Sequence, residues 1–146
     1  MTRVGNEIRL ERIVEARRED VFRAWTDPDQ LMHWWGPENC TTPYAEVDLR
    51  PGGKYLFVMH PPEGEPLRVA GVYREVAPPQ RLVYTWKWEA GVPDPTESLV
   101  TVEFDDLGDR TRITITHSGF EAGSPTESYN EGWKSALNKL VTFLKH

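Results

Sequence analysis

The pattern of hydrophobic and polar positions begins with a strand. Between Glu7 and Glu15, the apolar residues Ile8, Leu10 and Ile13 are separated by charged residues. This near-alternation is the two-residue period of a β-strand that has one buried face. We therefore expect the fold to start with a half-buried strand.

Two short helices are predicted next. Val21, Phe22 and Trp25 have the i, i+1, i+4 spacing of one helical face. Asp27-Pro28 separates the two helices, because Asp is a favoured N-cap residue and Pro suits the first helical position. The second helix carries two adjacent tryptophans and is expected to end at Gly36-Pro37.

Six consecutive strands are predicted in the middle of the chain, separated by turns rich in Pro and Gly. Their expected ranges are 44–49, 54–60, 67–76, 81–89, 97–105 and 110–117. The clearest alternation is in the fourth of these, where Leu82, Tyr84, Trp86 and Trp88 point to one face. Short turns between consecutive strands predict antiparallel pairing.

A long amphipathic helix is predicted at the end. Ser124-Pro125-Thr126-Glu127 has the residues of a capping box, and apolar residues then recur every three or four positions as far as Leu144. Because the helices and strands are segregated, the fold class is α+β. A sheet of this size must curl, and this helix is the long apolar element that is available to cover its concave face.

Length and charge exclude several classes of protein. The 146 residues predict one domain, residues 1–146, and the net charge of -6 predicts no binding to nucleic acid. No apolar run approaches the roughly 20 residues of a membrane span, and the first residues lack the apolar stretch of a secretory signal. A single cysteine, Cys40, gives no reason to expect disulfides, so a cytoplasmic location is predicted.

The unusual feature of the composition is its aromatic content. Six Trp, five Tyr and five Phe are many for a chain of this size, and such side chains bury large areas in cores and binding sites. The adjacent Trp34 and Trp35 are expected to differ, because neighbouring positions of a helix point in different directions. We expect one of them to pack under the sheet edge and the other to cover the mouth of the interior or to contact a partner, with structural packing as the favoured alternative.

Several segments, taken in order, resemble one family. They are Val21-Phe22-Arg23-Ala24-Trp25-Thr26-Asp27-Pro28, Trp34-Trp35-Gly36-Pro37, Asp48-Leu49-Arg50-Pro51-Gly52-Gly53, Gly71-Val72-Tyr73-Arg74-Glu75-Val76, and His117-Ser118-Gly119-Phe120 with Gly132-Trp133. Together they resemble the single-domain bacterial proteins that are similar to the activator of the ninety-kilodalton heat-shock protein ATPase, within the START-like (SRPBCC) superfamily. The resemblance implies a helix-grip fold, in which a curved antiparallel sheet wraps the C-terminal helix around a cavity.

The predicted ligand-binding residues are those whose position in the pattern points them into this cavity. They are Tyr55, Phe57, Met59, Tyr84, Trp86, Trp88, Phe104, His117, Trp133 and Leu137. The alternative is that the aromatic residues simply fill a core. Gly132 lies in the middle of the last helix, where it predicts either a close approach to the sheet or room for a ligand.

Catalytic and metal chemistry has little support in the sequence. His117 is the one weak catalytic candidate, and its alternative role is a structural histidine bonded to a backbone carbonyl. Cys40 with His33 or His60 has neither the pattern of an activated nucleophile nor zinc-ligand spacing. We therefore expect no metal and no cofactor.

Three functions remain open at this point. The first is binding of a small hydrophobic ligand of lipid, polyketide or aromatic type, and we expect this rather than an enzyme. The second is a cyclase or aromatase that uses the same cavity. The third is a co-chaperone-like interaction protein, as in the eukaryotic heat-shock ATPase activators, although no residue of the chain identifies a chaperone-binding surface. An edge strand or the helix with Trp34 and Trp35 also leaves a homodimer possible.

Overall fold

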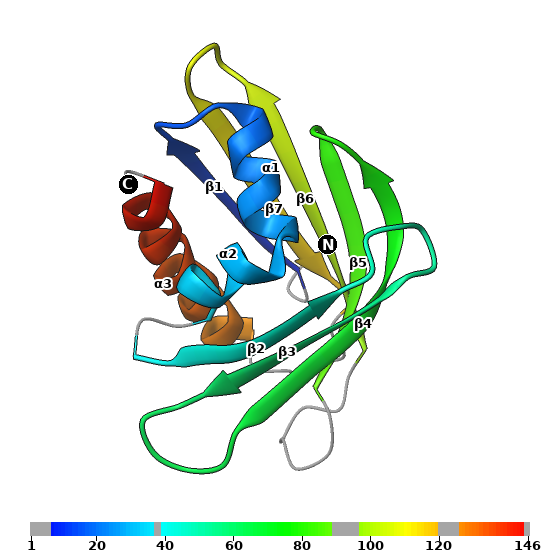
Figure 1. Ribbon diagram of the computed structural model, residues 1–146, viewed down its shortest axis with the longest axis vertical. Helices are drawn as coiled ribbons and strands as arrows, with labels where there is room; N and C mark the ends of the chain where they lie inside the picture. The colour runs from blue at the N-terminus through cyan, green and yellow to red at the C-terminus, as the bar shows by residue number, and fades with distance from the viewer. Residues whose placement is uncertain (1–6, 37–38, 89–96, 120–125, 145–146) are drawn as a thin grey trace, which may run out of the picture.

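The structure is a computed structural model that describes residues 7–36, 39–88, 97–119 and 126–144 (Figure 1). The side chains of Trp88 and of residues 126–128 are not among those described. The predicted capping box at Ser124 also lies outside the described residues.

The core of the fold is one antiparallel sheet of seven strands in the order β1-β7-β6-β5-β4-β3-β2. The strands are β1 (Ile8–Val14), β2 (Thr41–Val47), β3 (Lys54–His60), β4 (Leu67–Ala77), β5 (Arg81–Trp88), β6 (Ser98–Asp106) and β7 (Thr111–Ser118). Strands β2 to β7 form a meander, and β1 pairs with β7. The predicted α+β class and helix-grip layout are confirmed, with β2 beginning three residues earlier than the pattern predicts.

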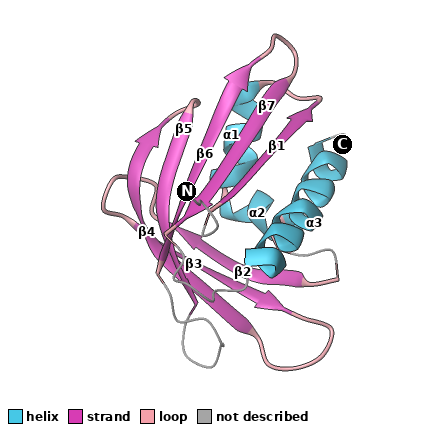
Figure 2. Cartoon of the chain, turned by 180° about the vertical axis from the view of Figure 1, so that it is seen from behind, coloured by secondary structure: helices cyan, strands magenta, loops and turns pink. Residues whose placement is uncertain are grey.

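Three helices cover one face of the sheet, which we call the inner face (Figure 1, Figure 2). They are α1 (Arg18–Thr26), α2 (Pro28–Trp34) and α3 (Thr126–Leu144). Helix α1 packs against β6, α2 against β2 and α3 against β1, and α2 also contacts α3. The closest backbone contacts of the helices with the sheet are thus at its two edges and at β6. Among the described residues, no helix is both long and apolar enough to span a membrane.

The hydrophobic pattern assigns Ile13 to the wrong face of β1. Register pairs Arg12 with Ile113, which lies on the inner face, so Ile13 points to the other side and is 46% exposed. The apolar residues at inward positions of β1 are Ile8, Leu10 and Val14. A polar residue on an inward position of an edge strand broke the alternation on which the prediction depended.

Both adjacent tryptophans are buried, which contradicts the expectation that only one of them faces fully inward and agrees with a packing role for both. Trp34 is the last residue of α2, and its indole donates to the carbonyl of Ala24 at 2.9 Å. Trp35 has already left the helix, with φ -67° and ψ 141°, and its backbone carbonyl accepts from the Thr42 hydroxyl at 2.7 Å. The change from helical to extended backbone between the two residues lets both side chains point inward.

Two glycine-containing segments of the sequence resemblance meet at β4. The amide of Gly52 donates to the Tyr73 carbonyl at 2.8 Å, and the Tyr73 amide donates to the Gly53 carbonyl at 2.9 Å. A Cβ atom on Gly71 would lie 2.0 Å from the carbonyl oxygen of Thr85, so only glycine fits there. These motif residues therefore hold the turn after β2 and the β4–β5 pair in place.

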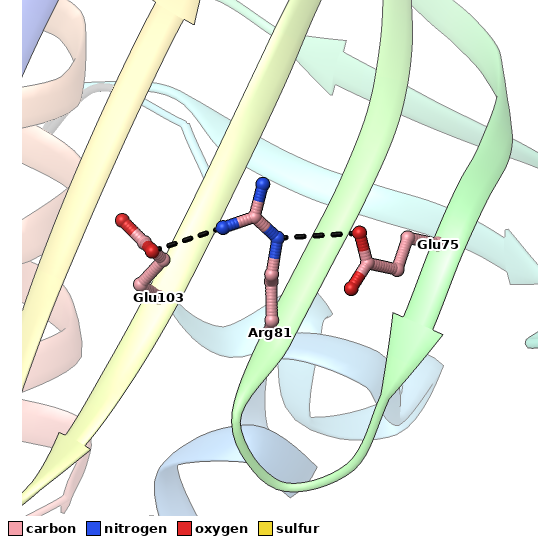
Figure 3. A network of polar contacts seen from close by, with 3 residues as sticks. All are labelled: Glu75, Arg81 and Glu103. Carbon is pink, nitrogen blue, oxygen red and sulfur yellow. Dashed lines mark hydrogen bonds and ion pairs between the residues drawn. The ribbon is translucent and has the colours of Figure 1, made fainter.

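The outer face of the sheet carries the charged contacts. Arg81 donates to Glu75 at 3.2 Å and to Glu103 at 3.0 Å (Figure 3). All three side chains are at least 40% exposed, and ion pairs of this kind contribute about 1 kcal/mol or less. The charges of this network point away from the helices and so leave the interior apolar.

Candidate functional site

The described part of the predicted ligand-binding set lies together on the inner face. Nine of its ten residues have described side chains, and each of the nine is at most 6% exposed: Tyr55, Phe57, Met59, Tyr84, Trp86, Phe104, His117, Trp133 and Leu137. The side chain of the tenth, Trp88, lies outside the described residues. Burial agrees with both alternatives, a cavity wall and a filled core, so the cavity stays a prediction.

Aromatic rings form a continuous network across this interior. Trp25 of α1 stacks on Trp133 of α3 with ring centres 6.2 Å apart, and Trp133 lies 5.6 Å from Trp86 of β5. Trp86 in turn lies 5.6 Å from Trp35, which contacts Phe57 of β3 at 4.9 Å. The network therefore links α1 and α3 to β5 and β3 in the middle of the sheet.

Sequence reasoning left Trp25, Trp35 and Tyr73 out of the predicted site. Trp25 was assigned to the buried face of its helix but not to the site, Trp35 follows the end of α2, and Tyr73 stands beside a register shift in β4. All three lie in segments that carry the family resemblance, and this was the available signal.

A polar group sits inside the apolar network. His117 is fully buried at the end of β7, with its Nε2 atom 2.7 Å from the hydroxyl of Ser98. The indole Nε1 of Trp133 donates to the Nδ1 atom of His117 at 3.1 Å. Ser98 also donates to the backbone carbonyl of Trp86 at 3.4 Å. Both ring nitrogens of His117 are thus bonded to side chains, whereas sequence reasoning considered only a backbone carbonyl.

These contacts define which nitrogen of His117 carries the proton. An indole N–H only donates, so Nδ1 must accept from Trp133 and cannot be protonated. A neutral imidazole then carries its proton on Nε2, which donates to Ser98. A serine nucleophile needs the opposite arrangement, in which the imidazole accepts the hydroxyl proton. The Ser98–His117 pair is therefore arranged for structure or binding, and not for covalent catalysis.

Three phenols form a second group on the inner face, which we call the tyrosine cluster: Tyr55, Tyr73 and Tyr84. Their ring centres lie 5.3 to 5.8 Å apart. Burial raises the pKa of all three well above the ordinary tyrosine value, and the indole hydrogen bond from Trp25 partly opposes this at Tyr84. Each phenol is therefore protonated at neutral pH and is available as a hydrogen-bond donor.

Neither the lone cysteine nor the exposed histidines form a reactive site. Partial burial raises the pKa of the Cys40 thiol, and the nearby charge of Lys139 only partly offsets this, so the thiolate is disfavoured. The ring of His33 stacks on Phe143 with centres 5.6 Å apart. Within the described residues, no three His, Cys, Asp or Glu side chains come close enough together to hold a metal ion.

Gly132 does not make the close approach to the sheet that was one of its two predicted roles. A Cβ atom built there would meet no described atom within 4 Å. The close approach is therefore wrong, whereas room for a ligand stays a prediction, because Gly132 is half-buried and also borders solvent. Helix α3 would tolerate a larger residue at this point.

Comparisons with known proteins give a consistent picture of the family. The profile of the family described as "Activator of Hsp90 ATPase homolog 1-like protein" matches residues 15–145. None of the curated proteins matches this chain in sequence.

Solved structures agree with this assignment. A protein from Chromobacterium violaceum is 29% identical, with a TM-score of 0.88 over 97% of this chain and 98% of that chain. The AHSA1 protein from Silicibacter pomeroyi is 32% identical, with a TM-score of 0.81 over 95% of this chain and 97% of that chain. DynU16, a protein in the dynemicin biosynthetic locus, is 19% identical with a TM-score of 0.75 over 96% of this chain and 47% of that chain, which is a likeness of fold.

Proposed function

We propose that this chain, which belongs to the START-like family of Activator of Hsp90 ATPase homolog 1-like proteins, binds a small aromatic molecule against the ring network of its inner face. The helix-grip fold supports a ligand-binding or cyclase-like role in general. The observation that carries the narrower proposal is the fully buried His117, held between Ser98 and Trp133 within a wall of aromatic rings.

The composition of this interior favours binding over simple core packing. Ligand sites are mostly apolar and aromatic, with a few polar groups in fixed positions. A core that serves stability alone has no need of a buried imidazole, whose polar atoms must each find a partner. Here the partners of His117 are the donor Trp133 on α3 and the acceptor Ser98 on β6, so the polar group is held in one orientation.

The same geometry favours a binding protein over an enzyme of the cyclase type. A cyclase needs groups that take up and release protons in the site. The tyrosine cluster keeps its protons at neutral pH, and the Nδ1 atom of His117 is occupied by Trp133. Within the described interior, these groups are therefore suited to orienting a ligand.

The experiment compares two matched tryptophan substitutions. Trp133→Phe and Trp34→Phe each remove a buried indole whose N–H donates one hydrogen bond, but only Trp133 contacts His117. We expect Trp133→Phe to weaken binding of ethylnaphthalene, measured by calorimetry, by about fivefold, which corresponds to about 1 kcal/mol for one aromatic contact. Trp34→Phe should leave the affinity unchanged.

Thermal unfolding of both variants serves as the control for folding. Similar losses of stability in the two variants, with a loss of affinity only in Trp133→Phe, are the expected result. Equal affinities for the probe in the wild type and in both variants would show that the ring network is core and not a binding site. Failure of the wild-type protein to bind ethylnaphthalene would overturn the proposal outright.

A further inference from the structure

Two members of the tyrosine cluster lie side by side at the centre of the sheet. Tyr73 of β4 and Tyr84 of β5 are directly opposite in the register, so their side chains leave the same face. Their rings lie 5.8 Å apart in an edge-to-face arrangement, and the residues are only 2% and 4% exposed. Tyr84 also contacts Trp25 of α1, which places the pair on the inner face, in the ring network described above.

The hydroxyl groups of this pair have donor capacity that the protein does not use. Tyr84 accepts a hydrogen bond from the indole of Trp25 at 3.3 Å. Among the described residues, no acceptor for the Tyr84 O–H or the Tyr73 O–H is found, whereas Tyr55, the third phenol, donates to the carbonyl of Thr85 at 2.5 Å. Neither hydroxyl oxygen is a fully enclosed atom that lacks every hydrogen-bond partner. The remaining donor capacity of the pair is therefore open to an acceptor from outside the protein.

Both hydroxyls are donors under ordinary conditions. Burial raises the pKa of Tyr73 and of Tyr84, so neither phenol ionises near neutral pH. The hydrogen bond from Trp25 to the Tyr84 oxygen withdraws electron density from that hydroxyl and strengthens it as a donor. Each hydroxyl of the pair is therefore suited to donate a hydrogen bond to a ligand oxygen.

The charge of the surroundings defines the kind of oxygen. No Lys or Arg residue in the described parts of the chain is buried as a whole, although the Nε atom of Arg18 at the start of α1 is enclosed, and Arg81 binds two glutamates on the opposite face. A carboxylate bound here would be buried without a countercharge, which is strongly unfavourable. A neutral carbonyl oxygen has two lone pairs and brings no charge.

We propose that the hydroxyls of Tyr73 and Tyr84 together bind the carbonyl oxygen of a neutral aromatic ketone. This inference rests on the proposed function, since it requires that an aromatic molecule occupy the inner face. It adds the chemical class of the ligand and the two residues that select it, neither of which belongs to the polar group around His117.

The test compares three probes of similar shape: acetylnaphthalene, ethylnaphthalene, which lacks the oxygen, and naphthoate, which is an anion. We expect the wild-type protein to bind acetylnaphthalene about tenfold more tightly than ethylnaphthalene, as two hydrogen bonds between neutral groups allow. Tyr84→Phe and Tyr73→Phe should each reduce this preference to about threefold. Naphthoate should bind more weakly than acetylnaphthalene.

Tyr44→Phe is the matched control, because it removes the hydroxyl of an exposed phenol on β2 that bonds to Glu46 and lies outside the inner face. It should keep the preference for the ketone. The inference is overturned if the wild type binds acetylnaphthalene and ethylnaphthalene equally, if Tyr73→Phe and Tyr84→Phe both keep the full preference, or if naphthoate binds best. In those cases ethylnaphthalene still binds and the proposed function stands. If ethylnaphthalene does not bind, the proposed function fails as well.

Discussion

Replacing Ser98 with alanine tests the proton arrangement at His117. The Nε2–H of this histidine donates to the Ser98 hydroxyl, and the ring is fully buried. Ser98→Ala removes the acceptor and puts no other in its place. A change of tautomer does not help, because Trp133 would then point its N–H at a protonated Nδ1. In either tautomer the buried imidazole loses the hydrogen bond that Ser98 provides.

The expected loss of stability follows from the loss of the hydrogen bond between the His117 imidazole and the Ser98 hydroxyl. Leaving a buried polar group without its partner costs about 1–3 kcal/mol. The second bond of Ser98, to the Trp86 carbonyl, is long at 3.4 Å and adds little. We therefore expect Ser98→Ala to lower the free energy of unfolding by about 2 kcal/mol, which lowers the midpoint of thermal unfolding by about 4–8 °C for a chain of this length.

A serine on the neighbouring strand provides the matched control. Ser118 of β7 is half-buried and pairs with Leu99 of β6, on the face of the sheet away from His117. Ser118→Ala removes the same hydroxyl group and should change stability by less than about 0.5 kcal/mol. Equal midpoints for Ser98→Ala and Ser118→Ala would refute the reasoning. So would nitrogen NMR shifts of the wild-type imidazole that place the proton of His117 on Nδ1.

Two further predictions concern the backbone of β4 and the tyrosine cluster. Gly71→Ala should lower the free energy of unfolding by about 3 kcal/mol, because its Cβ would meet the Thr85 carbonyl at 2.0 Å. Gly132→Ala should raise the free energy of unfolding by about 1 kcal/mol, because its Cβ would meet no described atom within 4 Å and alanine favours the helix. A denaturant titration in which both variants change the free energy of unfolding in the same direction would contradict this. The pKa values of the tyrosine cluster are higher in the native state than in the unfolded chain. The contribution of these tyrosines to the free energy of unfolding is therefore fully present below about pH 10 and is lost as the pH rises past that value. Phenolate absorbance should show these three tyrosines ionising only as the protein unfolds, and their reversible ionisation near pH 10 in the folded state would contradict the expectation.

The sheet and most of the candidate site follow directly from the hydrophobic pattern. In β3 and β5, strict alternation assigns Tyr55, Phe57, Tyr84 and Trp86 to one face, and all four are buried there. Because successive side chains of a strand point to opposite faces, residues two positions apart share a face, and this grouping can be made without knowledge of tertiary contacts. The meander follows in the same way from the short turns between strands.

The parts that could not be predicted depend on contacts between distant segments. Trp35 turns inward because the backbone leaves the helix at that residue, which spacing within α2 does not reveal. Ser98 and Trp133 become the partners of His117 although they lie 19 and 16 residues away along the chain. Nothing in the local pattern around a buried serine indicates that its hydroxyl accepts from an imidazole.

Part of the motifs that carry the family resemblance acts on the backbone. Asp27 caps α2 by accepting from the amide of Asp29 at 3.0 Å, and Gly71 makes room for the Thr85 carbonyl. Of the side chains that we propose to meet a ligand, His117, Trp133 and Tyr73 lie inside the motif segments, whereas Tyr84 and Ser98 lie outside them. Proteins that share the motifs are therefore expected to share the fold. If the proposed site is correct, their ligands are expected to differ wherever positions such as Tyr84 and Ser98 differ, because function depends on the residues of the site and not on the fold alone.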